Sequence, residues 1–332
     1  MPAISVIIVN WNGAQFLPRC FQSLREQTWR GFQVLLVDNG STDDSVTLTS
    51  SNFPEVDIVV FGRNLGYAEA NNRAASLTEA QYLFFLNNDT HLHSDALATL
   101  VSTAESHPDI AIWAPQQRTY DGTHYLNAGM SIDLLGYPCV GNPPAHKLFY
   151  ADGACLFIRR AIFNALGGFD PQHFMFFEET DLCWRAWLWG YRVAAVPQAI
   201  VFHKAGGTAG SSIVKDGKYT TSRNKRRLAH RNQWAMIIKN YSAITLCVAV
   251  PLFAALTLAE VFVLAATGQR AALKDAYVPA WGDLLRGRSR LLTMRRHVQA
   301  SRVVSDCVIL RRMEWRLVTV QHFLRGARPT IT

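Results

Sequence analysis

Carboxylates that directly follow apolar segments are the residues of this sequence best suited to chemistry. The first is Asp89, which closes Asn87-Asn88-Asp89 after the strongly strand-like run 82–86. In an open α/β sheet such a strand end lies at the carboxyl edge, where ligands bind. A carboxylate at that edge can hold a divalent cation, and the cation can hold a diphosphate. Asp89 is therefore a candidate metal ligand.

A second acidic group follows the aromatic residues at 174–177. Glu178, Glu179 and Asp181 place three carboxylates within four positions. An apolar wall raises the proton affinity of a carboxylate and suits it to act as a general base. The alternative is a helix N-terminus, where acids favour the macrodipole. That alternative explains one or two of the acids, but not the aromatic wall.

Two glycine-containing turns carry further candidates. Asp38 ends the strand-like run 32–37, and Gly40 permits a sharp turn, so the carboxylate can bind a ribose or a base. The alternative is a helix N-cap formed by Ser41 or Asp43, which is compatible with a binding role of Asp38. Downstream, Arg63 lies in a glycine-rich loop where a cation can meet a phosphate. Taken alone, this motif favours the alternative of an ordinary solvated loop arginine.

A histidine and two missing motifs complete the evidence from short patterns. His203 follows the last strand-like run and precedes a small, polar segment, which fits a site that closes over a ligand. A lone histidine is also commonly structural. The chain contains neither GxGxxG nor GxxxxGK[ST], which argues against a dehydrogenase and a P-loop phosphotransferase.

The elements that must position these residues alternate between strand and helix. Strands are predicted at 4–9, 32–37, 57–61, 82–86, 110–114, 154–158 and 193–196. Helices are predicted at 14–27, 41–50, 67–78, 94–106 and 160–166. This order predicts a doubly wound, parallel α/β sheet covered by helices. Residues 115–150 show no clear period and are predicted to be an irregular excursion over the sheet.

Charge divides the chain into two parts. Residues 1–200 contain 11 Lys and Arg against 19 Asp and Glu, whereas residues 201–332 contain 22 against 6. We therefore expect a catalytic domain at 1–212 and a basic, hydrophobic helical region at 213–332.

The six cysteines form no CxxC pair and no cluster with histidine, which is typical of reduced thiols in a cytoplasmic protein. The N-terminus enters a strand pattern at once, so no signal peptide is expected.

The basic region also contains an apolar run long enough to cross a bilayer, at 243–266. Nucleic-acid-binding tails need no such run, so a membrane is the favoured partner. Eight Lys and Arg lie in 215–239 and thirteen from Arg270 onward, so a single crossing would place one basic block outside. Pro251 and Glu260 also weaken a straight span. A kinked, re-entrant or interfacial helix pair fits better, and packing against the catalytic domain is the alternative.

Taken together and in order, these segments resemble family 2 glycosyltransferases with the GT-A fold. The resemblance covers about residues 3–210. It rests on ISVIIVNWNG, LLVDNGSTDDS, RNLGYAEANN, LFFLNNDT, DGACLFIRR, GGFDPQHFMFFEETDLCWRAWLWGYR and HKAGGT. The wording of LFFLNNDT and FFEETDLCWR, with the basic hydrophobic tail, is most similar to bacterial rhamnosyltransferase-like enzymes of O-antigen and cell-wall assembly. It implies a mixed, mainly parallel sheet with helices on both faces and a membrane-associated helical tail.

The resemblance also implies roles for particular residues. Glu179 matches the usual general base, with Glu178 beside it, and Asp181 matches an acid that often positions the acceptor. Asp89 would be the metal-binding acid of the DxD motif and His203 a further ligand for Mg²⁺ or Mn²⁺. The nucleotide-sugar would be bound by residues at strand ends and in the nearby loop: Val9, Asn10, Asn12, Asp38, Arg63, Asn64, Gly66 and Asn88.

One position departs from the family pattern, because Asn87 replaces the first acid of DxD. Magnesium often uses one or two carboxylates together with substrate phosphates, so binding remains plausible but weak without the nucleotide.

The implied function is inverting transfer of a sugar, best L-rhamnose from dTDP-rhamnose, to a lipid-linked glycan at the cytoplasmic face of the plasma membrane. The alternatives are UDP-galactofuranose, UDP-GlcNAc or UDP-glucose as donor, a non-catalytic nucleotide-sugar-binding subunit, and, least favoured, a nucleic-acid binder.

Overall fold

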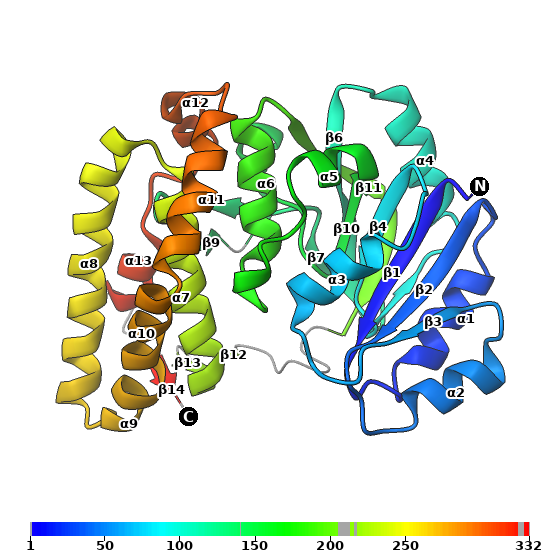
Figure 1. Cartoon of the computed structure of the whole chain (residues 1–332), viewed down its shortest axis with the longest axis horizontal. Coiled ribbons are helices and arrows are strands. Elements are labelled where there is room, and N and C mark those ends of the chain that lie inside the picture. The colour runs from blue at the N-terminus through cyan, green and yellow to red at the C-terminus, as the bar shows by residue number, and fades with distance from the viewer. Residues whose placement is uncertain (1, 140, 205–212, 216–217, 325–328, 332) are drawn as a thin grey trace.

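A nine-stranded mixed sheet forms the first two thirds of the chain in this computed structural model, which describes residues 2–139, 141–204, 213–215, 218–324 and 329–331 (Figure 1). The strand order is β3-β2-β1-β4-β10-β6-β11-β5, with β7 paired to β6. The strands are β1 (Ile4–Asn10), β2 (Phe32–Asp38), β3 (Asp57–Val60), β4 (Tyr82–Leu86), β5 (Thr90–Leu92), β6 (Ile110–Thr119), β7 (Tyr125–Asn127), β10 (Cys155–Arg159) and β11 (Arg192–His203).

Parallel and antiparallel pairs are combined in this sheet. Strands β1, β2, β3 and β4 pair in parallel, as do β6 and β11, while β10 runs antiparallel between β4 and β6. The carboxyl ends of the first parallel strands therefore meet at one edge, which is where the predicted site residues of β1, β2 and β4 lie. The predicted doubly wound mixed sheet is confirmed.

Alternation of side chains places a hydrophobic layer on each face of the sheet. On β4, Leu83 and Phe85 point into one layer, and Tyr82, Phe84 and Leu86 point into the other. All five side chains are buried, as expected for a central strand covered on both faces. The first layer is covered by α3 (Tyr67–Ala75), α5 (Arg160–Ala165) and α6 (Glu178–Leu188), and the second by α1 (Leu17–Arg25) and α4 (Ala96–Ser106).

Several boundaries differ from the sequence-based expectation. Helix α2 spans Ser45–Asn52 instead of beginning at residue 41, and β6 continues to Thr119 into the segment expected to be irregular. That segment also forms β7, β8 (Ser131–Ile132), β9 (Pro138–Cys139) and a short 3-10 turn. The short strand β5 was not anticipated, and β11 continues through His203, so this histidine ends the strand instead of following it. All six cysteines are free thiols.

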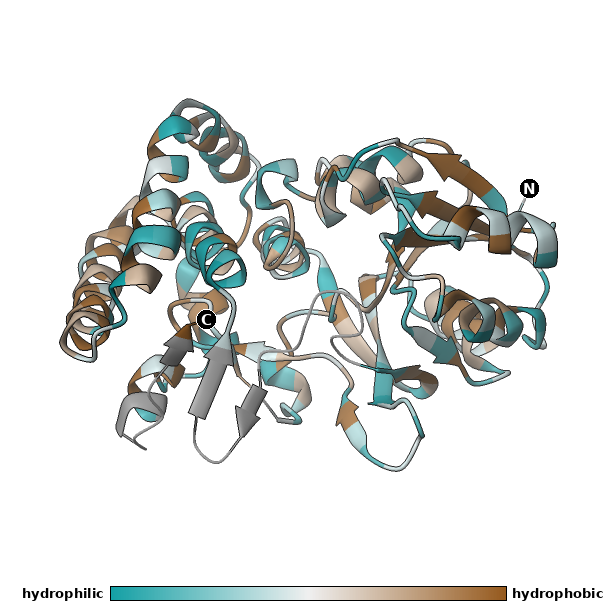
Figure 2. Ribbon diagram, turned by 90° about the horizontal axis from the view of Figure 1, so that it is seen from below, coloured by the Kyte–Doolittle hydropathy of each residue, from teal (hydrophilic) through white to brown (hydrophobic). Residues whose placement is uncertain are grey.

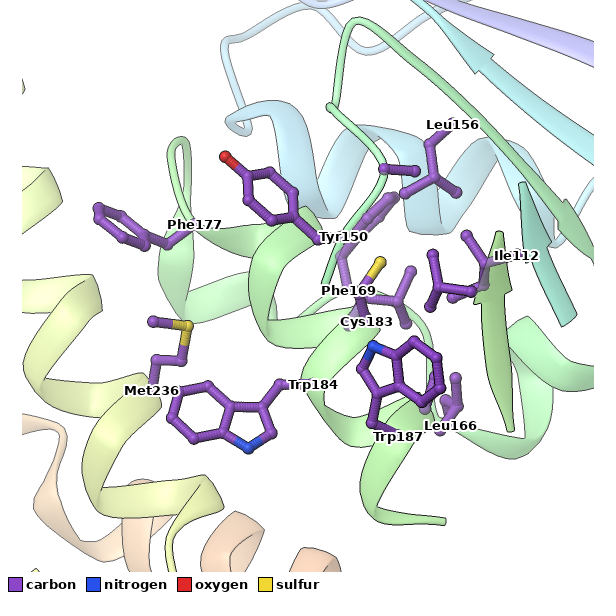
Figure 3. Packing of buried hydrophobic residues seen from close by; sticks show 14 of the residues in the cluster. Ile112, Tyr150, Leu156, Leu166, Phe169, Phe177, Cys183, Trp184, Trp187 and Met236 are labelled. Atoms are coloured by element: carbon purple, nitrogen blue, oxygen red, sulfur yellow. The ribbon is translucent and has the colours of Figure 1, made fainter. Parts of the chain in front are cut away.

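The C-terminal region is predominantly helical and packs against α6. It contains α7 (Arg223–Asn240), α8 (Ala243–Ala266), α9 (Arg270–Ala272), α10 (Val278–Arg286), α11 (Arg288–Ala300), α12 (Asp306–Arg312) and α13 (Val318–Leu324), with short strands β12 (Ile213–Lys215), β13 (Lys218–Thr221) and β14 (Pro329–Ile331). Met236 of α7 joins Trp184 of α6 in the same core cluster as the sheet (Figure 3). The predicted domain boundary at 212 adjoins residues outside the described ones and stays a prediction.

Helix α8 is one continuous helix that contains Pro251, and not a pair of helices. It is long and apolar enough to cross a membrane, and only 17% of its most apolar window is buried. Figure 2 shows the hydrophobic colour along this helix at the left edge of the molecule. Its buried side contacts α7, where Phe253 stacks on Trp234 at 4.3 Å between ring centroids.

Candidate active site

The ends of β1 and β2 are joined by polar side chains. Asn10 is fully buried; its Nδ2 donates to Ser41 Oγ at 3.2 Å, and its Oδ1 accepts from Asn88 Nδ2 at 2.7 Å. Asn12 adopts a positive φ of 52°, and its Oδ1 accepts from Thr42 N at 2.8 Å. These predicted binding residues thus shape the strand ends.

Asp38 lies at the floor of this edge and is only 2% exposed. Its Oδ2 accepts a hydrogen bond from Ser41 N at 3.1 Å, while its Oδ1 is buried and finds no partner in the part of the chain that the structure describes. A buried carboxylate oxygen without a donor is costly, so it is suited to accept a hydrogen bond from a ligand. The predicted N-cap by Ser41 or Asp43 is wrong: Asp44 is the N-cap residue of α2 and makes no side-chain cap hydrogen bond, although the preceding Asp43 accepts from Ser45 N at 3.2 Å.

The loop that follows β3 lies against the end of β2. Gly40 has φ of +82°, and a Cβ atom there would lie 2.7 Å from the Arg63 backbone. Asn64 Oδ1 accepts from Gly66 N at 2.9 Å and from Asn39 Nδ2 at 3.1 Å, which closes the loop. The Arg63 side chain is exposed beside this edge. Val9, also predicted to bind the nucleotide, is half-buried at the end of β1.

Asp89 and His203 form the second part of the site. His203 Nε2 lies 3.3 Å from Asp89 Oδ1, and His203 Nδ1 is bonded to Gln117 Oε1 at 2.9 Å. Gln117 Oε1 is an acceptor, so it favours a proton on His203 Nδ1. The other ring nitrogen, Nε2, then faces Asp89. Burial opposes a charge on His203, but the hydrogen bond and charge of Asp89 outweigh burial and raise the pKa of the imidazole.

The chemistry of this pair suits a metal ion. A carboxylate and an imidazole whose second nitrogen is held by a hydrogen bond are common ligands of Mn²⁺ and related cations. Over residues 2–139, 141–204 and the other described ranges, no third His, Cys, Asp or Glu completes a metal-binding group. The residues therefore fit a cation that takes its remaining ligands from a diphosphate and water.

Glu178 and Glu179 begin α6 and form the third part. Burial, followed by the charge of Asp152, raises the pKa of Glu178 to about 7, and Glu178 Oε2 is buried without a partner among the described residues. Burial, then the charges of Glu178 and Asp152, raise the pKa of Glu179 well above its ordinary value. Glu179 as a whole residue is half-buried, whereas Glu178 is buried. A carboxylate with raised proton affinity is suited to general-base chemistry near neutral pH.

Asp152 was missed by the sequence interpretation, although it lies in the DGACLFIRR stretch. Its charge raises the pKa of Glu178, Glu179 and His203, so it lies within electrostatic reach of both the glutamates and the Asp89–His203 pair. The adjacent Gly153 lies beside Glu179, since a Cβ atom added to this glycine would lie 3.6 Å from Glu179 Cγ. A lone aspartate in a loop offers no periodic signal that could have identified it.

The predicted role of Asp181 in positioning an acceptor is not supported by its surroundings. This carboxylate is fully buried. It accepts from Arg185 Nε at 2.8 Å and from Asn240 Nδ2 at 3.0 Å, and it pairs with Lys239 at 3.0 Å. Lys239 and Asn240 belong to α7, so Asp181 lies on the side of α6 that packs against α7. It is therefore a structural residue.

Comparison with known proteins agrees with this geometry. Residues 5–167 match the model of the family Glycosyl transferase family 2, a range that ends before Glu179 and His203. An N-acetylglucosaminyl-diphospho-decaprenol L-rhamnosyltransferase of Mycobacterium tuberculosis is 30% identical over 237 residues, which cover 62% of this chain and 77% of that protein. The O-antigen chain rhamnosyltransferase WbaN of Salmonella anatum is 25% identical over 212 residues, covering 61% and 66%.

Solved structures share the fold at lower identity. A mannosyltransferase from Pyrobaculum calidifontis, in complex with GDP-Man and Mn²⁺, superposes with a TM-score of 0.55 at 19% identity, covering 90% of this chain and 86% of that one. GalNAc-T7 with UDP, GalNAc and Mn²⁺ gives 0.59 at 18% identity, covering 71% and 47%.

Proposed function

Because this chain belongs to glycosyl transferase family 2, we propose that it moves L-rhamnose from dTDP-rhamnose to a hydroxyl of a lipid-linked glycan, with inversion at the anomeric carbon. The observation that carries the proposal is that one loop touches both parts: a Cβ atom on Gly153 would lie 3.6 Å from Glu179 Cγ, and Ala154 O accepts from Asn87 N at 2.9 Å, two residues before Asp89. A proton acceptor and a cation-binding pair thus belong to one site. The choice of rhamnose follows the names of the Mycobacterium and Salmonella relatives, and the choice of a lipid-linked acceptor follows the name of the Mycobacterium enzyme.

Glu179 acts as the general base in this mechanism. It takes the proton of the acceptor hydroxyl while that oxygen forms a bond to the anomeric carbon. The bond from that carbon to the donor diphosphate breaks at the same time, and the diphosphate leaves with the electron pair. A cation held by Asp89 and His203, Mg²⁺ or Mn²⁺, would supply positive charge where the leaving group gains negative charge.

The strand ends hold the nucleotide. The unpartnered Oδ1 of Asp38 accepts a hydrogen bond from the ribose or base, and the exposed Arg63 meets the donor from the loop after β3. Asn10 and Asn12 act chiefly by fixing the shape of this edge, since their side chains are bonded to protein groups.

A donor panel tests this function. We expect transfer from dTDP-rhamnose onto an N-acetylglucosaminyl-diphospho-polyprenol in the presence of Mg²⁺ or Mn²⁺. Glu179→Gln should abolish transfer and leave donor affinity nearly unchanged, because the amide keeps the shape but cannot take a proton. Full turnover by this variant would refute the base assignment. Transfer from a UDP-sugar instead would replace rhamnose, and donor binding without transfer by the wild type would favour a non-catalytic subunit.

The apolar side of α8 supports association with a membrane surface. Ile244 and Phe262 are 85% and 74% exposed, and Val248 and Leu258 are also exposed on this helix. The opposite side of α8 is held to α7, where Glu260 pairs with Arg226. If α8 crossed the bilayer, the ion pair of Glu260 with Arg226 would enter the hydrocarbon. Helix α8 is therefore better suited to lie in the membrane–water interface. We place it on the cytoplasmic face, where nucleotide-sugars are made.

Vesicle binding tests this placement. Phe262→Glu should weaken binding to phosphatidylglycerol-containing vesicles, because a charge replaces buried apolar area at the interface. Leu77→Glu is the matched control, since Leu77 is 58% exposed at the end of α3 and outside the helical region. Equal binding of both variants would exclude α8 as the membrane contact.

A further inference from the structure

The four residues before α6, Phe174–Phe177, form a turn with unusual backbone, called the base turn below. Phe174, Phe176 and Phe177 have φ of 59°, 74° and 69°, and Asn12 is the only other non-glycine residue with positive φ in the described ranges. Bulky side chains rarely adopt this left-handed conformation. Neighbouring groups must therefore hold the base turn in place.

The base turn determines where α6 begins and hence where Glu179 lies. Phe177 is the N-cap residue of α6, and its carbonyl accepts the hydrogen bond of Asp181 N at 2.9 Å. Glu178 and Glu179 are the first two residues of the helix. A change in the backbone of the turn would therefore displace both carboxylates.

One side chain of α7 binds two residues of this turn and the residue before it. The Asn232 amide nitrogen lies 2.8, 2.9 and 2.7 Å from three carbonyl oxygens, those of His173, Met175 and Phe176. Its Oδ1 accepts from Arg231 Nε at 2.9 Å, which fixes the orientation of the amide. Asn232 is fully buried, where lost hydrogen bonds are most costly.

The other side of the turn touches the loop after β3 and the start of α3, where the predicted donor-binding residue Gly66 lies. Phe174 O accepts from Ala68 N at 3.2 Å, and a Cβ atom on Gly66 would lie 2.4 Å from the Phe174 ring. The base turn is thus held between the predicted donor loop and α7. Its position sets the distance between the base and the donor.

A cavity of about 280 Å³ lies beside Asn232 at the α10–α11 corner, and Gln172, His173, Arg231 and Leu291 are among its lining residues. Gln172 and His173 directly precede the base turn, so the segment that leads into the turn borders open space next to Asn232.

We propose that Asn232 is a positioning residue for glycosyl transfer, which fixes the base turn and through it the carboxylate of Glu179. The inference rests on the proposed function, because it takes Glu179 as the base. It also makes α7 part of the catalytic unit, although every site residue predicted from the sequence lies before residue 212.

Kinetics of Asn232→Ala test the proposal, with Gln233→Ala as the matched control. Gln233 is also a buried amide on α7, and its Nε2 donates to the Leu135 carbonyl at 2.9 Å, away from the base turn. We expect kcat of Asn232→Ala to fall about 10- to 100-fold with donor KM within about twofold of wild type, because misplacement of a reacting group by about 1 Å costs this much. Gln233→Ala should keep kcat near wild type at a similar loss of stability.

Amide hydrogen exchange provides a measurement that does not depend on activity. In Asn232→Ala, peptides covering 174–184 should exchange faster, whereas Gln233→Ala should leave them unchanged. Unchanged exchange in both variants, or equal kcat losses in both, would overturn the positioning role. If instead Glu179→Gln is active while exchange behaves as expected, the base assignment fails and the fastening of the turn by Asn232 stands.

Discussion

Replacing Lys239 by Met should destabilise the protein strongly, because this lysine is the shared cation of a buried ion cluster. Its Nζ lies 2.6 Å from Asp170 and 3.0 Å from Asp181, and all three side chains are at most 3% exposed. Asp181 retains Arg185, but Asp170 loses its cation. Removing one partner of a buried ion pair typically costs about 3–5 kcal/mol. We therefore expect a loss of this size in the free energy of unfolding at pH 7.

The loss should depend on pH in a defined direction. Burial by itself would raise the pKa of Asp170, but Lys239, followed by His173, holds it well below the usual range. In the wild type the stabilisation from this low pKa is present above about pH 4 and is lost as the pH falls through the folded pKa. In Lys239→Met burial is opposed only by His173 and the hydrogen bond from Gln172 N, so the pKa of Asp170 rises and the variant loses stability as the pH rises.

Urea unfolding followed by tryptophan fluorescence at pH 5 and pH 8 measures this difference. The gap between wild type and Lys239→Met should widen from pH 5 to pH 8. Arg223→Met is the control on the same helix, because the Arg223–Asp275 pair is exposed and is worth about 0–1 kcal/mol. A loss below about 1 kcal/mol for Lys239→Met, or one that does not change with pH, would refute the assignment of a tightly coupled cluster.

Three further changes probe the site itself. Glu178→Gln should move the acid limb of the pH–rate profile to lower pH, because the charge of Glu178 raises the pKa of Glu179. An unmoved limb would show that the charge of Glu178 does not affect the catalytic pKa. The same variant should have a higher free energy of unfolding than the wild type at pH 8, where the ionised Glu178 destabilises the fold. Gly66→Ala should lower kcat, since its Cβ would strike the ring of Phe174, and wild-type kinetics would show that the loop yields. Asp38→Asn should weaken donor binding about 10- to 100-fold by calorimetry, as expected for a lost hydrogen bond to a charged group.

Local pattern was sufficient for most of the sheet, because its strands carry their own signal. The run Tyr82–Leu86 is apolar at every position and is buried on both faces, so length and composition identified it as a central strand. The three-residue strand β5 carried no such signal, and it forms because β11 pairs with it. Residues 115–150 looked irregular since β6, β7 and the small strands there are held by pairing across the sheet.

The candidate site divides in the same way. Asp38 and Asp89 were identifiable because each ends an apolar strand, which places its side chain at the carboxyl edge. Glu178, Glu179 and Asp181 were indistinguishable in sequence, since all three lie in the first turn of one helix. Packing separates them: α7 buries Asp181 against Lys239 and leaves Glu179 half-exposed.

The sequence by itself determined the alternating fold, the acidic strand ends and the apolar helix of the C-terminal region, because these depend on residue type and spacing along one segment. Only the tertiary structure decided which acid can meet a substrate, that Asp152 acts on both parts of the site, and that Asn232 holds the base turn. These relations join residues far apart in the chain. They arise from burial and contact, which no local pattern encodes.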